Sequence, residues 1–214
     1  DSIGRLVGRI TVDDVMDEMR EQAERDYQLA SGLSQDVETD DSVFRQTTAR
    51  LPWLLIGMLG GIGNSMILGN FDSTFAAHPE MALYIPLIGG TGGNVGTQSS
   101  ALVVQGLANS SLDANNTWKQ ILKESVVALI NATIISMLVY VYNFIRFGAT
   151  ATVSYSVSLS LFAVVMFASI FGTLVPMTLE KMKIDPAIAT GPFISITNDI
   201  IGMLLYMGIT VMLS

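Results

Sequence analysis

Five long apolar segments occupy the chain beyond residue 50. Each is long enough to cross a bilayer core of about 30 Å as an α-helix, although the first is short and rich in glycine. Half of the 214 residues are hydrophobic, 14% are charged and the mean hydropathy is +0.49, which excludes an ordinary soluble domain. The sequence predicts an all-α, polytopic membrane protein with five transmembrane helices, at about Leu51–Leu68, Ala82–Ala108, Ile121–Ile145, Val153–Leu179 and Ala187–Leu213.

The first quarter of the chain has a different composition. Residues 1–50 hold 12 of the 19 acidic residues and 6 of the 11 basic ones, so we expect a segment outside the membrane. Three parts are predicted: a strand remnant over 1–12, a connecting helix and loop over 13–50, and a membrane domain over 51–214. Asp13 and Asp14 are predicted to cap the helix, which ends near Ser31. The chain starts without Met and in mid-pattern, as expected for a piece of a longer polypeptide.

Basic residues predict the orientation in the membrane. With five spans and the N-terminus in the cytoplasm, every Lys and Arg except Arg146 flanks the cytoplasmic ends of the spans. Such an excess is the usual mark of the cytoplasmic side. We therefore expect a multi-pass protein of the cell (inner) membrane, with a cytoplasmic N-terminus and an extracytoplasmic C-terminus.

One carboxylate, Asp199, lies in the middle of the last apolar segment. If Ala187–Leu213 is one helix of about 40 Å, Asp199 lies near the membrane midplane, and no other acid is expected to be placed this way. An ionised side chain there is costly and usually marks an ion or substrate pathway. The alternative is a neutral carboxyl group that hydrogen-bonds to Asn94, Thr97 or Gln98.

Backbone oxygens are the second expected feature of the pathway. Glycines crowd the centre of the second segment, and Thr91, Asn94, Gln98 and Gln105 recur along one face. Such a pattern fits close helix packing or a helix that lines a water-filled cavity. In the fifth segment Pro192 has no N–H, which leaves the carbonyl of Ile188 free for another partner, such as a hydrated cation.

Composition restricts the metal. The chain has no cysteine and a single histidine, His78, so thiolate and histidine-rich sites are excluded and oxygen ligands remain. Mg²⁺ keeps several waters and needs only one or two carboxylates, which suits a wet pathway containing Asp199. A symmetric dimer would present two such carboxylates to a divalent ion. Asp185 precedes Pro186 and fits either a helix cap or an acid at the cytoplasmic mouth of the pathway.

Three stretches carry a family resemblance: GGTGGNVGTQSSALVVQGLA, IDPAIATGPFISITNDIIG and RLVGRITVDDVMDEM. The first two resemble the MgtE family of magnesium channels and transporters, and the third resembles the end of a CBS domain and the family's plug helix. The resemblance implies a homodimer with a pore lined by the second and fifth spans, closed when Mg²⁺ binds the cytosolic side, and an N-terminal domain and CBS pair outside this chain. It assigns metal contacts to Asp199, Asp185, Gly90, Gly93, Ile188, Asp14, Asp17 and Asp26. We also include Asn94, Thr97 and Gly191, from the same two segments, in the predicted metal site.

Several positions depart from the family pattern. Gln22 and Arg25 stand where acids are expected in the plug helix, so its ion sites are expected to be fewer or weaker. Gly191, Thr97 and Ala101 replace larger or more polar residues of the pore, which bears on ion selectivity.

The leading functional hypothesis is a passive Mg²⁺ channel or facilitator, with Mg²⁺ as both the transported ion and a regulatory ligand. The alternative is a proton- or sodium-coupled transporter or exporter of Mg²⁺, Mn²⁺ or Co²⁺. An enzyme is not expected, because an intramembrane aspartyl protease needs two facing carboxylates and Asp199 is the single candidate in the chain. No nucleic-acid partner is expected.

Overall fold

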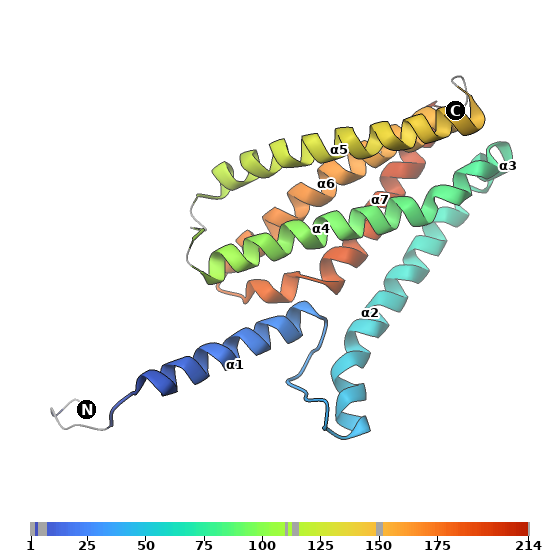
Figure 1. Ribbon diagram of the computed structural model, residues 1–214. Helices are drawn as coiled ribbons and strands as arrows, with labels where there is room; N and C mark the ends of the chain where they lie inside the picture. The colour runs from blue at the N-terminus through green and yellow to red at the C-terminus, as the bar shows by residue number, and fades with distance from the viewer. Residues whose placement is uncertain (1–2, 4–7, 110, 113–115, 149–151, 214) are drawn as a thin grey trace.

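The computed structural model describes residues 3, 8–109, 111–112, 116–148 and 152–213, and in this part of the chain helices are joined by loops and no strand is found (Figure 1). The all-α prediction is confirmed. The elements in chain order are α1 (Val12–Ala30), α2 (Val43–Gly69), α3 (Asp72–Ala77), the 3₁₀ turn η1 (Pro79–Tyr84), α4 (Ile85–Ala108), α5 (Thr117–Phe147), α6 (Thr152–Lys181), the 3₁₀ turn η3 (Pro186–Ala189) and α7 (Pro192–Leu213).

Helix α6 is the centre of the bundle. It packs against α4, α5 and α7, while α2 packs chiefly against α7 along the side of the bundle (Figure 1). The core contains Leu161 and Val164 of α6, Ile88 of α4 and Tyr206 of α7, all at most 1% exposed. The Tyr206 hydroxyl is satisfied because it donates to the backbone oxygen of Met81, at 2.7 Å.

Small residues set the distance between α4 and α6. A β-carbon added to Gly172 of α6 would overlap the backbone oxygen of Gly96 in α4, so the two backbones are in direct contact. Glycine allows this approach, which is typical of helix packing in membranes.

Among the described residues, four helices are long and apolar enough to cross a membrane: α2, α5, α6 and α7. Helix α4 has 24 residues and spans the same bundle, but glycine, Thr, Asn and Gln dilute its apolar residues. The fifth span therefore stays a prediction.

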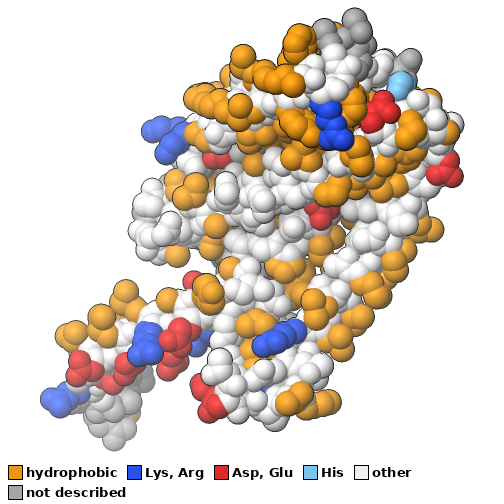
Figure 2. Space-filling model, turned by 45° about the vertical axis from the view of Figure 1, so that its right-hand side comes forward, with side chains coloured by type: hydrophobic (Ala, Val, Ile, Leu, Met, Phe, Trp, Pro, Cys, Tyr) orange, Lys and Arg blue, Asp and Glu red, His pale blue; other side chains and the backbone are white. Residues whose placement is uncertain are grey.

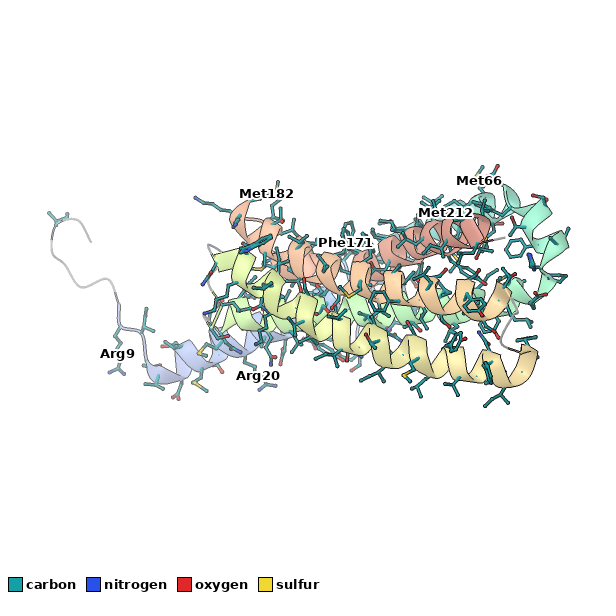
Figure 3. All side chains as sticks on the ribbon, turned by 90° about the horizontal axis from the view of Figure 1, so that it is seen from above. Arg9, Arg20, Met66, Phe171, Met182 and Met212 are labelled. Carbon is teal, nitrogen blue, oxygen red and sulfur yellow. The ribbon has the colours of Figure 1, made fainter. Side chains whose placement is uncertain are left out.

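The charged helix α1 lies at one of the two ends of the bundle. Met182 and Arg20 lie toward one end, and Met66 and Met212 lie toward the other (Figure 3). Hydrophobic side chains cover much of the outward face of the bundle, whereas charged side chains gather along α1, which projects beyond it (Figure 2). This arrangement fits an apolar bundle with a polar helix at one end.

The prediction of one continuous helix over Ala187–Leu213 is wrong. The segment is interrupted after η3, and α7 begins at Pro192. Proline suits the first helical position because its missing N–H is not needed there, and Gly191 adopts a positive φ of 54°. Asp199 is thus the eighth residue of α7, about 10 Å from the start of a helix of about 33 Å, and not at its midpoint.

Other boundaries also differ from the prediction. The first span begins earlier, at Val43, with Ser42 as its N-cap, and the first part of the second segment is the separate turn η1. The N-cap of α1 is Thr11 and not Asp13, because the Thr11 hydroxyl and the Asp14 carboxylate bond each other's backbone N–H groups. Half of the predicted strand over 1–12 falls on residues outside the described part. Of the rest, residues 8–11 have no regular secondary structure and Val12 begins α1.

We expect Gly172→Ala to lower the thermal stability of the purified protein in detergent, because the added methyl group meets the backbone of Gly96. Overpacking of this kind typically costs about 1–3 kcal/mol. Gly208→Ala is the matched control: it lies in α7, nothing lies within 4 Å of its added β-carbon, and it should retain or slightly raise stability. Equal melting temperatures for the two variants would contradict the close contact of α4 and α6.

Candidate cation site

Asp199 lies in a cleft formed by α4, α7 and α2. The cleft has a volume of about 320 Å³ and includes Gly89, Gly90, Gly93 and Asn94 of α4. A β-carbon added to Gly89 or Gly93 would lie 3.4 Å or 3.6 Å from Asp199 Oδ1, so these glycines bring the α4 backbone next to the carboxylate. Asp199 is half-buried and can reach both the cleft and the α4 backbone.

The alternative hydrogen bonds expected for Asp199 are not found among the described residues. The Thr97 hydroxyl instead donates to the backbone oxygens of Gly93 and Asn94, each at 3.0 Å. Thr97 lies one turn beyond the cleft and is not among the residues that line it. The carboxylate is therefore not engaged by the groups that would have given it a purely structural role.

Sequence reasoning missed one polar group of this cleft, Asn64 of α2. Its side chain lines the cleft, and its Oδ1 atom is buried without a hydrogen-bond partner in the described part of the chain. The sequence alone does not show that Asn64 lies near Asp199. The two residues come together because α2 packs on α7, as it does where Gly60 contacts Ile196.

A second cleft lies where α1 meets the membrane bundle. It has a volume of about 460 Å³ and includes Asp26 and Gln22 of α1, Glu180 at the end of α6, and Asp185. Asp185 caps η3, since its Oδ1 accepts a hydrogen bond from the backbone N–H of Ala187 at 2.9 Å. The structure thus brings Asp26 and Asp185 to one cleft, a proximity that the sequence analysis did not predict.

The interruption before α7 contacts the end of α1 directly. A β-carbon on Gly191 would overlap the backbone oxygen of Ala30, and one on Gly32 would lie 2.6 Å from the Pro192 ring. Gly191 is therefore covered by α1 and does not lie beside Asp199. Ile188, in η3, is 41% exposed and lies outside the Asp199 cleft.

The other two predicted ligands in α1, Asp14 and Asp17, line neither of these two clefts. Asp14, in the first turn, accepts hydrogen bonds from the Thr11 hydroxyl and backbone N–H, and these lower the pKa of its carboxyl group. Asp17 lies in a charged hollow between the same helix and the loop that follows it. About 18 Å of helix separates Asp14 from Asp26.

Gln22 and Arg25, which depart from the family pattern in α1, contact neighbouring acids of the same helix. Gln22 donates a hydrogen bond of 2.6 Å to Asp26, and Arg25 pairs with Glu18 at 3.1 Å and with Glu21 at 3.6 Å. These contacts occupy carboxylate oxygens that would otherwise be free for a cation.

Sequence reasoning did not single out a second carboxylate that the structure buries, Glu124. Glu124 of α5 is only 9% exposed and accepts hydrogen bonds from the hydroxyls of Ser99 and Ser169. The available signal was a charged residue inside the predicted span Ile121–Ile145, but its neighbour Lys123 made that stretch resemble a membrane boundary.

Among the described residues, no three His, Cys, Asp or Glu side chains come together as a metal site. A divalent cation beside Asp199 would therefore have to be held by one carboxylate of this chain together with waters, backbone oxygens and amide groups. That is the ligand set that Mg²⁺ accepts most readily.

Comparisons with known proteins identify a family of membrane transporters. Residues 85–209 match the family model MgtE, described as a divalent cation transporter. The magnesium transporters MgtE of Bacillus subtilis and Thermus thermophilus are 32% and 33% identical to the chain over 95% and 98% of its length. The magnesium transporter MgtE of Enterococcus faecalis is 29% identical over 97% of the chain. The chain spans about half the length of these relatives, 45–46%.

If the Asp199 cleft is hydrated, a cysteine placed at Asn94 should react with a charged thiol reagent. The chain has no cysteine of its own, and Asn94 is an exposed residue of the cleft wall. Two controls should stay unlabelled in a membrane: Val164→Cys, which is buried in the core, and Leu129→Cys, which is 49% exposed on α5 and expected to face lipid. Labelling is measured by mass spectrometry; equal labelling of the cleft and lipid-facing variants would show that the cleft is not a distinct aqueous space.

Proposed function

Because the chain belongs to the MgtE family of divalent cation transporters, we propose that it carries Mg²⁺ across a membrane. In this proposal two copies form a homodimeric channel, and α4 and α7 of each line the pore. The observation that supports it best is the Asp199 carboxylate, which lines a cleft together with Asn64 and Asn94 and receives no hydrogen bond from the described residues.

The size and lining of the cleft suit a hydrated ion. Six waters at about 30 Å³ each occupy roughly 180 Å³, which is less than the cleft volume of about 320 Å³. Mg²⁺ gives up its waters reluctantly, so contacts through water to Asp199, to Asn94 and to the backbone at Gly90 and Gly93 suit it better than a closed cage of acids.

The proposed dimer would supply the second negative charge needed to balance a divalent cation. One carboxylate balances half the charge of a divalent ion, and a two-fold axis beside the cleft would bring a second Asp199 into reach. Gly90 and Asn94 lie four residues apart on α4, and Asn94 and Ala101 lie seven apart. All three are exposed in the single chain, so they form a stripe open to such a partner.

The proposed driving force is the membrane potential. A divalent ion moving inward gains about 4.6 kcal/mol per 100 mV, at about 2.3 kcal/mol per charge. We also propose that the cleft containing Asp26 and Asp185 binds a regulatory Mg²⁺. An ion there would hold α1 against η3 and so against the start of α7, where Gly191 contacts Ala30.

We expect Asp199→Asn to reduce the initial rate of Mg²⁺ uptake into proteoliposomes at least tenfold, because the neutral amide cannot compensate the charge of the ion. The variant is nearly isosteric and should purify with unchanged helix content. Asp40→Asn, an exposed acid in the loop after α1, should transport at the rate of the unaltered protein. Undiminished uptake by Asp199→Asn would refute the assignment of the pathway.

The same assay separates a passive channel from a coupled transporter. Under a fixed membrane potential, imposed proton or sodium gradients should leave the Mg²⁺ flux of the unaltered protein unchanged. A flux that follows either gradient would favour the coupled transporter.

A regulatory ion between α1 and η3 should protect the α1–α2 region from trypsin. We expect millimolar Mg²⁺ to slow cleavage after Arg25 and Arg45 several-fold, and Asp26→Asn to lose most of this protection. Asp13→Asn, at the far end of α1, is the control and should keep it. Protection of the Asp26→Asn variant equal to that of the unaltered protein would contradict a site at this cleft.

A further inference from the structure

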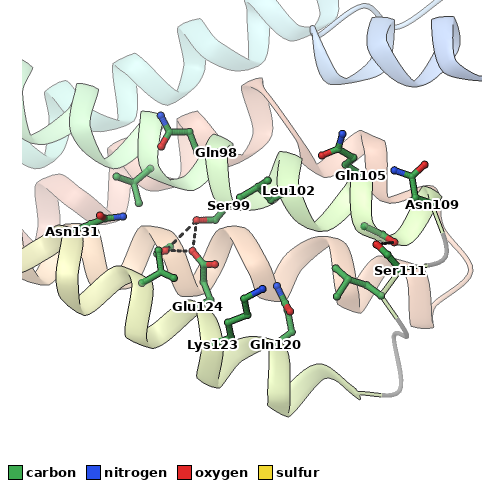
Figure 4. Close-up of a pocket in the computed structure, with 15 residues that line it drawn as sticks. Gln98, Ser99, Leu102, Gln105, Asn109, Ser111, Gln120, Lys123, Glu124 and Asn131 are labelled. Carbon is green, nitrogen blue, oxygen red and sulfur yellow. Dashed lines mark hydrogen bonds between the residues drawn. The ribbon is translucent and has the colours of Figure 1, made fainter.

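A polar pocket that the proposed pathway does not use lies between α4 and α5 (Figure 4). Both helices pack on α6 far more than on each other, which leaves a hollow of about 500 Å³ with Ser169 of α6 at its base. It shares no lining residue with the Asp199 cleft, because it uses a different face of α4, represented by Gln98 and Leu102.

Glu124 gives this pocket a buried carboxylate. The hydroxyls of Ser99, at 2.7 Å, and Ser169 both donate to its Oε1 atom, and the two hydroxyl oxygens are 3.0 Å apart. The other carboxylate oxygen turns away from the two serines (Figure 4). In the described part of the chain no Lys, Arg or His forms a salt bridge with Glu124. A carboxylate that is 9% exposed and lacks a cationic partner favours a ligand that brings a positive charge.

The rest of the lining adds a complementary charge and many hydrogen-bonding groups. Lys123 lines the same pocket and is itself exposed. The pocket therefore presents a buried acceptor of ammonium hydrogens together with an exposed cation that suits a phosphate. Side-chain amides lie along both walls: Gln98, Gln105, Gln120 and Asn131.

The position of Glu124 along α5 suits a lipid head group. Helix α5 has 31 residues and is about 46 Å long, so it extends about 8 Å beyond each side of a hydrocarbon core of about 30 Å when centred. Glu124 lies about 10 Å from the start of α5, at the boundary between head groups and hydrocarbon, and Lys123 can extend toward the head groups.

We propose that this pocket binds the head group of an aminophospholipid, with its primary ammonium at Glu124 and its phosphate at Lys123. The surroundings suit the acyl chains of such a lipid: Leu102 is 64% and Leu122 is 59% exposed. A second hollow of about 640 Å³ along the outer face of α5 adjoins the first, shares Lys123 and Gln120 with it, and is lined mainly by apolar surface. The proposal requires α5 to cross a membrane but does not depend on the transported ion or on Asp199.

The test compares lipids that differ only in the head-group nitrogen. The full chain is purified in detergent, and dioleoylphosphatidylethanolamine or dioleoylphosphatidylcholine is added; retained lipid is counted by native mass spectrometry and the unfolding temperature is recorded. We expect the ethanolamine lipid to bind about tenfold more tightly, because its ammonium group donates hydrogen bonds and the trimethylated choline nitrogen does not.

Three variants locate the site. Glu124→Gln should abolish the preference for ethanolamine over choline, and Lys123→Gln should weaken the binding of both lipids. Asp199→Asn removes another membrane carboxylate and should keep the full preference, so failure of the proposed transport function and failure of this proposal give different results.

Equal binding of the two lipids by the unaltered protein would overturn the proposal even if the Glu124→Gln variant does not fold. A full ethanolamine preference in Glu124→Gln would also overturn it. So would rapid disulfide cross-linking between two copies that each carry Gln98→Cys, since a second copy would then cover the pocket.

Discussion

Close contact between α4 and α6 is the constraint on which the rest of the bundle depends. Gly96 and Gly172 meet through their backbones, and Gly92 leaves room for Val164 of α6. With α4 held this near, its glycine-rich face also lies against α7, and Gly89 and Gly93 come next to Asp199. Larger residues at the α4–α6 crossing would move α4 outward and open the cleft. The glycines of α4 thus serve packing and the site at the same time.

Some polar groups buried in the bundle have no hydrogen-bond partner among the described residues, which lowers the stability of the fold. Asn198, beside Asp199 in the sequence, is 1% exposed and lies against Gly96, and neither of its amide atoms has a hydrogen-bond partner among the described residues. An amide left unpaired in an apolar environment is unfavourable by about 1–3 kcal/mol. Its presence beside the carboxylate indicates that this turn of α7 is not optimised for stability alone, which is usual where a membrane helix carries function.

The sequence was sufficient to predict what depends on composition and local pattern. Helical class and the approximate segments follow from apolar length, and the prediction of a pathway at Asp199 rests on one charge in an apolar run. Interruption of the last segment could have been read from Gly191 and Pro192, but the apolar length of the run outweighed that local signal. Glu124 and Asn64 were missed for another reason: their roles depend on which helices become neighbours, and Ser99, Ser169 and Asp199 lie far from them in the chain.

The break between η3 and α7 is the place where α1 contacts the membrane bundle. If Ala187–Leu213 were one helix, α1 would meet only its side and a shift of α1 would have little effect on Asp199. Instead η3 and α7 are distinct elements, and α1 contacts the joint between them at Gly191 and, through Gly32, at Pro192. Asp199 begins the third turn of α7, so a rotation of α7 about its first residues would displace the carboxylate within the cleft. In the proposed regulation by Mg²⁺, an ion between Asp26 and Asp185 would therefore act on Asp199 through the start of α7.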